Sequence, residues 1–354
     1  MKNSKLKKFL HKFFKIFIIF MIGTAVINIV LFLVIFLNHQ NKLNKEEGLL
    51  VPPGEMVEVN GHDMHVIKTG NEKSQYTLVF LHNSGIVDDS VALIPLFDEL
   101  KEEFQLIYVD RSGVGYSEVS ESPRDIETMT EETRMALSKV GVEDNIIIVP
   151  LGTAGIEAIH WANTYPDEID GIIGINMNYP EQFKDITVEE YCGFFDYLMM
   201  GFTKIGGIRL VPSAYPNNDF GLYTDAQMRV RKALISRGFY TKDMYNEDMA
   251  TIDNAAKVTA EGMPDEQMYL IYSNPLMEPY VNESESVNEQ YNDALEENSE
   301  VDYIDEYNKP VKEYFSGMDN VVIDEISGPA RVYIYCPEEV AKLIKDYVNN
   351  EMLQ

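Results

Sequence analysis

Apolar residues along this chain form one long run and several short ones. The long run covers residues 16–37, which are 22 uncharged and mostly apolar positions. As a helix, a run of this length spans the hydrocarbon core of a bilayer, about 30 Å. Short runs rich in Ile, Val, Leu and Tyr follow at residues 78–81, 106–109, 146–149, 268–273 and 321–326. Such runs between turn signals are typical of buried strands.

Helical patterns alternate with these predicted strands, and Asn60-Gly61 favours a tight hairpin between two shorter strand patterns. This alternation of strand and helix patterns is interrupted twice. Residues 179–261 are helical in pattern and rich in Met, Phe and Tyr, and residues 278–307 carry eleven acidic residues but no Lys or Arg. The acidic insertion is expected to be a solvated, partly helical loop.

The residues that precede the long apolar run predict its orientation in the membrane. Six lysines and no acidic residue precede it: Lys2, Lys5, Lys7, Lys8, Lys12 and Lys15. Basic residues stay on the cytoplasmic side, so the bulk of the chain is expected outside the cytoplasm. A cleaved signal peptide is the alternative, but residues 38–41 offer no small-x-small cleavage site. An uncleaved single-pass signal-anchor in the cell membrane is favoured.

The strand pattern at residues 146–149 leads into the small-residue turn Pro150-Leu151-Gly152-Thr153-Ala154-Gly155 and then a helical stretch. This resembles the strand–turn–helix motif that presents a nucleophile. Residues 78–85 resemble a strand followed by a His-Gly-type oxyanion loop, and residues 106–117 resemble an Asp-Arg-x-Gly-x-Gly-x-Ser turn. With these segments in this order, residues 54 to 350 resemble the α/β-hydrolase family. The resemblance is to its proline-iminopeptidase-like members, and it implies an α/β core with a mostly parallel, eight-stranded-type sheet flanked by helices and covered by a helical cap.

The resemblance implies positions for a catalytic triad, and none holds a catalytic residue. Gly152 stands at the nucleophile position, Asn274 at the acid and Ala330 at the histidine. Shifting the register makes Thr153 the nucleophile, but Leu151 then falls where a small residue is needed. No histidine follows His160 in the remaining 194 residues. We therefore interpret the triad as lost, because a serine mechanism needs a base that can take the hydroxyl proton.

The same resemblance places Asn83, Ser84 and Thr153 where the family forms its oxyanion loop. His82 is interpreted as a structural residue of that loop, and His160 lies about two helical turns beyond Gly152. No His, Cys and carboxylate cluster has metal-ligand spacing, so neither a metal nor another cofactor is predicted.

The predicted organisation therefore has six parts. They are a cytoplasmic basic tail (1–15), a transmembrane helix (16–37), a tether (38–53), a first core segment (54–178), a helical cap (179–261) and a second core segment (262–354) containing the acidic insertion. From residue 46 onward, 21 basic residues face 58 acidic ones, a net charge of −37. Such acidity disfavours nucleic-acid binding, because phosphates are repelled. Cys192 and Cys336 either pair or remain as thiols.

Two functions remain open from the sequence. The favoured one is a pseudoenzyme, a hydrolase fold kept as an ectodomain that binds a small apolar ligand under the cap or a protein partner. The alternative is a serine-hydrolase-like esterase or peptidase that uses non-standard residues such as Thr153 or Ser84. The absence of an activating histidine weighs against the second.

Overall fold

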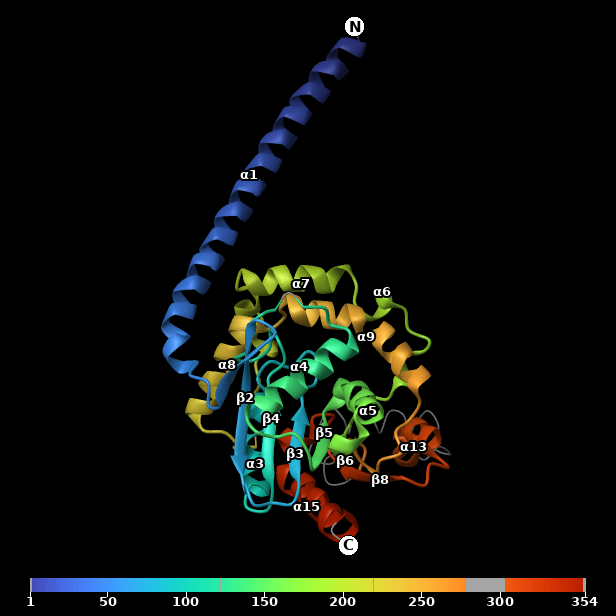
Figure 1. Cartoon of the computed structure of the whole chain (residues 1–354). Coiled ribbons are helices and arrows are strands. Elements are labelled where there is room, and N and C mark those ends of the chain that lie inside the picture. Colours follow the sequence, from blue (N-terminus) through green and yellow to red (C-terminus); the bar gives the residue numbers. More distant parts are fainter. Residues whose placement is uncertain (1, 121, 219, 278–302, 353–354) are drawn as a thin grey trace.

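The computed structural model describes residues 2–120, 122–218, 220–277 and 303–352. Its first element, α1 (Lys2–Glu46), is a single helix of 45 residues that projects from the rest of the chain (Figure 1). It is long and apolar enough to cross a membrane, and its apolar side chains are exposed. The helix includes most of the segment expected as a tether, because Gly48 and Pro52 are the first helix-breaking residues after the apolar run. A 3-10 turn, η1 (Glu47–Leu49), follows.

Eight strands form one mixed sheet. They are β1 (Glu55–Val59), β2 (His62–Gly70), β3 (Thr77–Leu81), β4 (Gln105–Val109), β5 (Ile146–Pro150), β6 (Ile169–Ile175), β7 (Met268–Asn274) and β8 (Val321–Ser327). Their order is β1-β2-β4-β3-β5-β6-β7-β8, and only the β1–β2 and β2–β4 pairs are antiparallel. Asn60 and Gly61 both have positive φ, which confirms the predicted hairpin between β1 and β2.

Helices cover both faces of the sheet, so the central strands are buried on both sides. They are α2 (Asp89–Ala92), α3 (Ile94–Leu100), α4 (Ile126–Lys139), α5 (Gly155–Thr164), α12 (Tyr303–Tyr307), α13 (Lys309–Phe315), α14 (Val332–Tyr335) and α15 (Pro337–Tyr347), with 3-10 turns η2 (Gly152–Ala154) and η3 (Pro166–Glu168) and the π-helical η7 (Val348–Met352). One apolar cluster packs α4 and α5 on the sheet, and a second packs α3 and α15 on the other face. This two-faced burial explains the continuous apolar runs of β3, β5 and β7.

Between β6 and β7, the regular structure in the described residues of the cap is helical. It contains η4 (Pro180–Phe183), α6 (Val188–Tyr191), α7 (Phe194–Lys204), η5 (Gly207–Leu210), η6 (Pro212–Ala214), α8 (Asp225–Gly238) and α9 (Lys242–Glu261). Figure 1 shows α7 and α9 across the end of the sheet to which the parallel strands point. That edge is where ligands bind in open α/β sheets. Of the acidic insertion, residues 278–302 lie outside the described residues, and residues 303–307 form α12.

Candidate functional site

The turn after β5 has the geometry of a strand–turn–helix elbow. The chain passes from β5 through Leu151 into η2 and then α5. Gly152 has a φ of +52°, in the left-handed region, whereas Thr153 does not have a positive φ. A Cβ built on Gly152 would lie 2.3 Å from Oδ1 of Asn83 and 2.7 Å from its Cγ. The backbone and its surroundings therefore both favour glycine at position 152.

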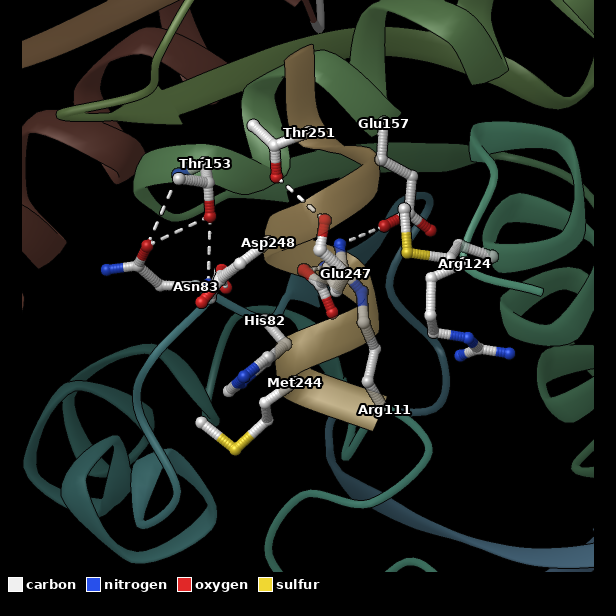
Figure 2. Close-up of polar contacts among 12 residues, drawn as sticks. His82, Asn83, Arg111, Arg124, Thr153, Glu157, Met244, Glu247, Asp248 and Thr251 are labelled. Atoms are coloured by element: carbon white, nitrogen blue, oxygen red, sulfur yellow. Dashed lines mark hydrogen bonds and ion pairs between the residues drawn. The ribbon is translucent and has the colours of Figure 1, made fainter. Parts of the chain in front are cut away.

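Asn83 and Ser84, on the loop after β3, hydrogen-bond to this turn. Figure 2 shows the side chain of Asn83 next to Thr153. Oδ1 of Asn83 accepts a hydrogen bond from the backbone N–H of Thr153 at 3.2 Å and lies 3.3 Å from the Thr153 hydroxyl. The backbone N–H of Ser84 donates to Oγ1 of Thr153 at 2.9 Å. In the hydrolase elbow, the N–H after the nucleophile and an N–H of this loop form the oxyanion hole. Here both N–H groups are bonded to side chains of the same chain.

Asn274 and Ala330 lie at the same edge of the sheet as Gly152, and both make structural hydrogen bonds. Asn274 ends β7, is fully buried, and uses its side chain to donate to Ile304 O at 2.9 Å and to accept from Leu276 N at 3.1 Å. The carbonyl oxygen of Ala330 accepts from the side chain of Asn176 at 2.6 Å. The structure thus brings the three sequence-predicted positions to one edge, without a nucleophile, acid or imidazole at any of them.

Three histidines of the core contact groups outside the elbow turn. Nδ1 of His65 lies 2.8 Å from Asp110, Nδ1 of His160 lies 2.9 Å from Glu261, and Nδ1 of His82 lies 3.0 Å from the Tyr108 hydroxyl. Within the described part of the chain, no histidine is hydrogen-bonded to Ser84 or Thr153. Burial, together with Arg111 and Arg331, lowers the pKa of His82 well below its usual value, so its ring is neutral.

Ser84 contacts a carboxylate that sequence reasoning did not find. The Ser84 hydroxyl donates to Oδ1 of Asp248 at 2.9 Å, and the Tyr240 hydroxyl donates to Oδ2 at 2.5 Å. Burial raises the pKa of Asp248, whereas these two hydrogen bonds lower it. Asp248 lies on α9, 164 residues from Ser84, and no local pattern in the cap distinguishes it from the other acidic residues.

A buried ionic cluster joins the cap to the core beside this site (Figure 2). Arg111 follows β4 and forms ion pairs with Glu157 of α5 and Glu247 of α9, all three with side chains at most 7% exposed. Two further residues of α9 bond to the core: Asp243 accepts from Ser112 and from Ser120 N, and Asn254 accepts from Ile126 N. Helix α9 is therefore fixed to the core along its length by buried polar contacts.

A cavity of about 290 Å³ opens between the cap and the core. Its lining includes the loop at residues 85–88, the cap residues Tyr215, Phe220 and Arg231, and Arg331 next to Ala330. Arg331 lies 3.5 Å from Asp89 and 3.9 Å from Asp88. Burial raises the pKa of Asp89 to about 7, opposed by Arg331. The cavity is thus lined by both aromatic and charged groups.

The two cysteines lie in different surroundings and do not form a disulfide. Sγ of buried Cys192 is 3.9 Å from the Tyr240 hydroxyl, and Sγ of Cys336 is 3.6 Å from Ser327 O. In the described ranges, no group of three or more His, Cys, Asp or Glu residues is arranged to hold a metal ion.

Solved structures with the same fold include several hydrolases. The ancestral haloalkane dehalogenase AncHLD2 aligns with a TM-score of 0.54 over 85% of this chain and 100% of its own. Cfl2 from Burkholderia cenocepacia aligns with a TM-score of 0.57 over 83% and 94%, and the enol-lactonase from Burkholderia xenovorans LB400 with 0.54 over 84% and 100%. Each is 13% identical to this chain, so the likeness shows a shared α/β-hydrolase fold and not a shared activity.

No protein-family model matches the chain. A curated relative does: YbdG of Bacillus subtilis (strain 168), an uncharacterized protein, is 30% identical over 340 residues. The alignment covers 94% of this chain and 97% of YbdG. The chain has an α/β-hydrolase fold and therefore belongs, by its identity to YbdG, to the YbdG family.

Proposed function

We propose that this protein is a membrane-anchored, proline-iminopeptidase-like member of the α/β-hydrolase fold that has lost catalysis and acts by binding. The observation that carries the proposal is the contact between Asn83 and the elbow. The Asn83 amide oxygen lies 2.3 Å from the position that the Cβ of a nucleophile would take, and it accepts from the Thr153 N–H. A substrate oxyanion needs that N–H group and the matching one from Ser84. With both bonded internally, the elbow does not stabilise a tetrahedral intermediate.

The other positions support the same conclusion. Gly152 lacks a side chain, Asn274 is hydrogen-bonded to backbone groups, and Ala330 provides no base. Arg331, next to Ala330, is permanently cationic and does not accept a proton. Acyl transfer requires a nucleophile and a base that act together, and neither is present in this arrangement.

The binding site that we propose is the cavity between the cap and the core. Its aromatic side chains, Phe220 and Tyr215, offer apolar contact, and Arg331 offers a charged donor. This lining narrows the expected apolar ligand to a small molecule that also carries a polar or acidic group. A protein partner on the outer surface is the other form of binding that the proposal includes.

We place the domain outside the cytoplasm. The support is the exposed apolar helix α1 and the six lysines that precede residue 16, because basic residues are retained on the cytoplasmic side. The acidic character of residues 46–354 suits a solvated domain at a cell surface.

A second candidate function rests on the hydrogen bond between Ser84 and Asp248. A carboxylate that accepts from a serine hydroxyl is a base, although a weaker one than imidazole. In this case Ser84 would be the nucleophile of an esterase or peptidase. The hydroxyl of Thr153 is less suited, because it accepts from Ser84 N and lies beside Asn83 Oδ1.

One experiment separates these functions. The full chain in detergent is treated with a fluorophosphonate probe and, separately, with p-nitrophenyl esters and aminoacyl amides. We expect no labelling and no turnover above a protein blank, and no difference between the wild type and Ser84→Ala. Saturable turnover that survives repurification and disappears in Ser84→Ala or Thr153→Val would establish the second function and overturn the first.

A further inference from the structure

Helix α7 presents an apolar face to solvent. Thr203 is buried against the domain, whereas Phe194, Phe195, Tyr197 and Leu198 are exposed. Phe194 and Phe195 are 70% and 82% exposed, and Tyr197 and Leu198 are about half exposed. Single exposed apolar residues are ordinary on protein surfaces, whereas a contiguous group of this size marks an interaction site.

This face carries no charged side chain. Asp196 points to the start of the helix, where its Oδ2 accepts from the backbone N–H of Gly193 at 2.8 Å. Lys204 lies at the other end, in the last turn. Between them the solvent side consists of aromatic, aliphatic and glycine positions. A charge-free face is unusual in a domain whose net charge is −37 from residue 46 onward.

The segment that follows the C-terminal end of α7 contacts the C-terminal part of α1. Arg209, in η5 directly after α7, donates to Nδ1 of His39 at 2.9 Å and forms an ion pair with Glu46. A Cβ on Gly206 would lie 2.3 Å from the Cβ of His39. His39 is buried and follows the end of the apolar run at Leu37 by two residues. The C-terminal end of α7 therefore lies close to the end of the apolar run of α1.

We propose that α7 docks on the outer surface of the bilayer that α1 spans, with Phe194, Phe195 and Leu198 at the boundary between headgroups and acyl chains. Figure 1 shows α7 at the top of the domain, on the side toward which α1 projects. Aromatic rings favour this interfacial zone. The acidic remainder of the domain is repelled by anionic headgroups, so contact is favoured at this neutral face. This inference rests on membrane anchoring by α1, which belongs to the proposed function.

The test uses the full chain in phosphatidylcholine vesicles with a tryptophan placed on α7. The single native tryptophan, Trp161, is fully buried in the core and is shielded from lipid-borne quenchers. The variant Phe195→Trp is compared with Val322→Trp, whose site is 47% exposed on the edge strand β8. Vesicles contain phosphatidylcholine with a nitroxide near the carbonyl end of the acyl chain. Because interfacial helices insert to that depth, we expect Phe195→Trp to lose roughly half of its added emission and to shift to the blue.

Val322→Trp and the wild type are expected to show no such quenching. Unquenched emission of Phe195→Trp in vesicles that retain the protein through an alkaline carbonate wash would overturn the docking and leave the anchoring intact. Loss of the protein in that wash would overturn the anchoring and the docking with it. A blue shift without quenching, accompanied by a dimer in cross-linking, would assign the face to a second copy of the chain and also overturn the proposal.

Discussion

The side-chain oxygen of Asn83 accepts a hydrogen bond from the backbone N–H of Thr153 at 3.2 Å, and its amide group fills the space next to the Cα of Gly152. The two observations have one consequence. A side chain at position 152 would need the volume that Asn83 occupies, and an incoming carbonyl oxygen would need the N–H that Asn83 holds. The loss of a nucleophile and the closing of the oxyanion hole are thus coupled through a single residue.

We therefore predict that Gly152→Ser destabilises the protein and gives no robust turnover. The new Cβ overlaps Asn83, and residue 152 has positive φ, so overpacking and backbone strain should lower the free energy of unfolding by about 2 kcal/mol. Urea unfolding of the full chain in detergent, followed by Trp161 fluorescence, measures this. Turnover stays absent because a serine without its base loses most of its rate.

The matched variant is Asn83→Gly combined with Gly152→Ser. Removing the amide should recover part of the lost stability, because residues in contact act non-additively. Equal destabilisation with and without Asn83 would show that the overlap is not the cause.

Adding Ala330→His and Leu276→Asp to Gly152→Ser is the route to weak esterase activity. Strong activity of Gly152→Ser alone would reveal a base that the described contacts do not contain.

The second prediction concerns Arg111, which holds the cap helix α9 to the core through Glu157 and Glu247. Arg111→Met leaves two buried carboxylates without a cation and should lower the free energy of unfolding by about 3–5 kcal/mol at neutral pH. Lys309→Met removes an exposed ion pair with Glu306 and should change the free energy of unfolding by less than about 1 kcal/mol.

The loss of stability caused by Arg111→Met should depend on pH. Burial raises the pKa of Glu247, and without Arg111 the folded-state pKa rises further. The folded state then binds more protons than the unfolded state above the ordinary pKa of glutamate, so the variant loses stability as pH rises from about 4. Unfolding curves at pH 4.5 and 8 should therefore differ more for Arg111→Met than for the wild type. An equal pH response in both would contradict the role of these carboxylates.

The third prediction concerns Asp89, beneath Arg331 at the cavity. Its pKa is raised to about 7 by burial, whereas an unfolded aspartate ionises near pH 4. Between about pH 4 and 7 the folded state binds more protons, so this group lowers stability as pH rises through that window. Asp89→Asn keeps an acceptor for the Tyr333 hydroxyl and removes the titration. We expect the variant to be more stable than wild type at pH 8, by on the order of 4 kcal/mol, and equal near pH 4.

Asp98→Asn is the control, since Asp98 is an exposed residue of α3. It should shift the stability curve little at any pH. If Asp89→Asn showed the same pH dependence as the wild type, the buried carboxyl would not be the group that titrates near pH 7.

The sequence predicts the fold better than the site. Apolar runs, the Asn60-Gly61 hairpin and the small-residue turn at Gly152 are local signals, and the structure contains each of them. The polar contacts that define the site are not local. Ser84 meets Asp248 over 164 residues and Arg111 meets Glu247 over 136, and in both pairs the acid lies on a cap helix with many similar residues. Only the packing of α9 on the core determines which acidic residues contact Ser84 and Arg111.

The role of Asn83 was also beyond the sequence. Its place on an oxyanion-type loop was predicted, but the direction of its side chain depends on the approach of that loop to the elbow. The length of α1 was missed for a different reason. The polarity of residues 38–46 indicates where the apolar run ends but not where the helix ends. Arg209 of the cap contacts Glu46 at the end of this polar part of α1.

The last prediction is topological. The continuous helix α1 and the six lysines before residue 16 predict a single-pass protein whose folded domain lies outside the cytoplasm. Protease added to intact protoplasts should digest the domain and leave a small protected fragment that contains residues 16–37. Replacing the six lysines with glutamine should reduce the fraction of correctly oriented chains, whereas replacing Lys42 and Lys45 should leave the orientation unchanged, because those two lie on the outer side. A domain that resists protease until the cells are lysed, in the wild type, would place it in the cytoplasm and reverse the assignment.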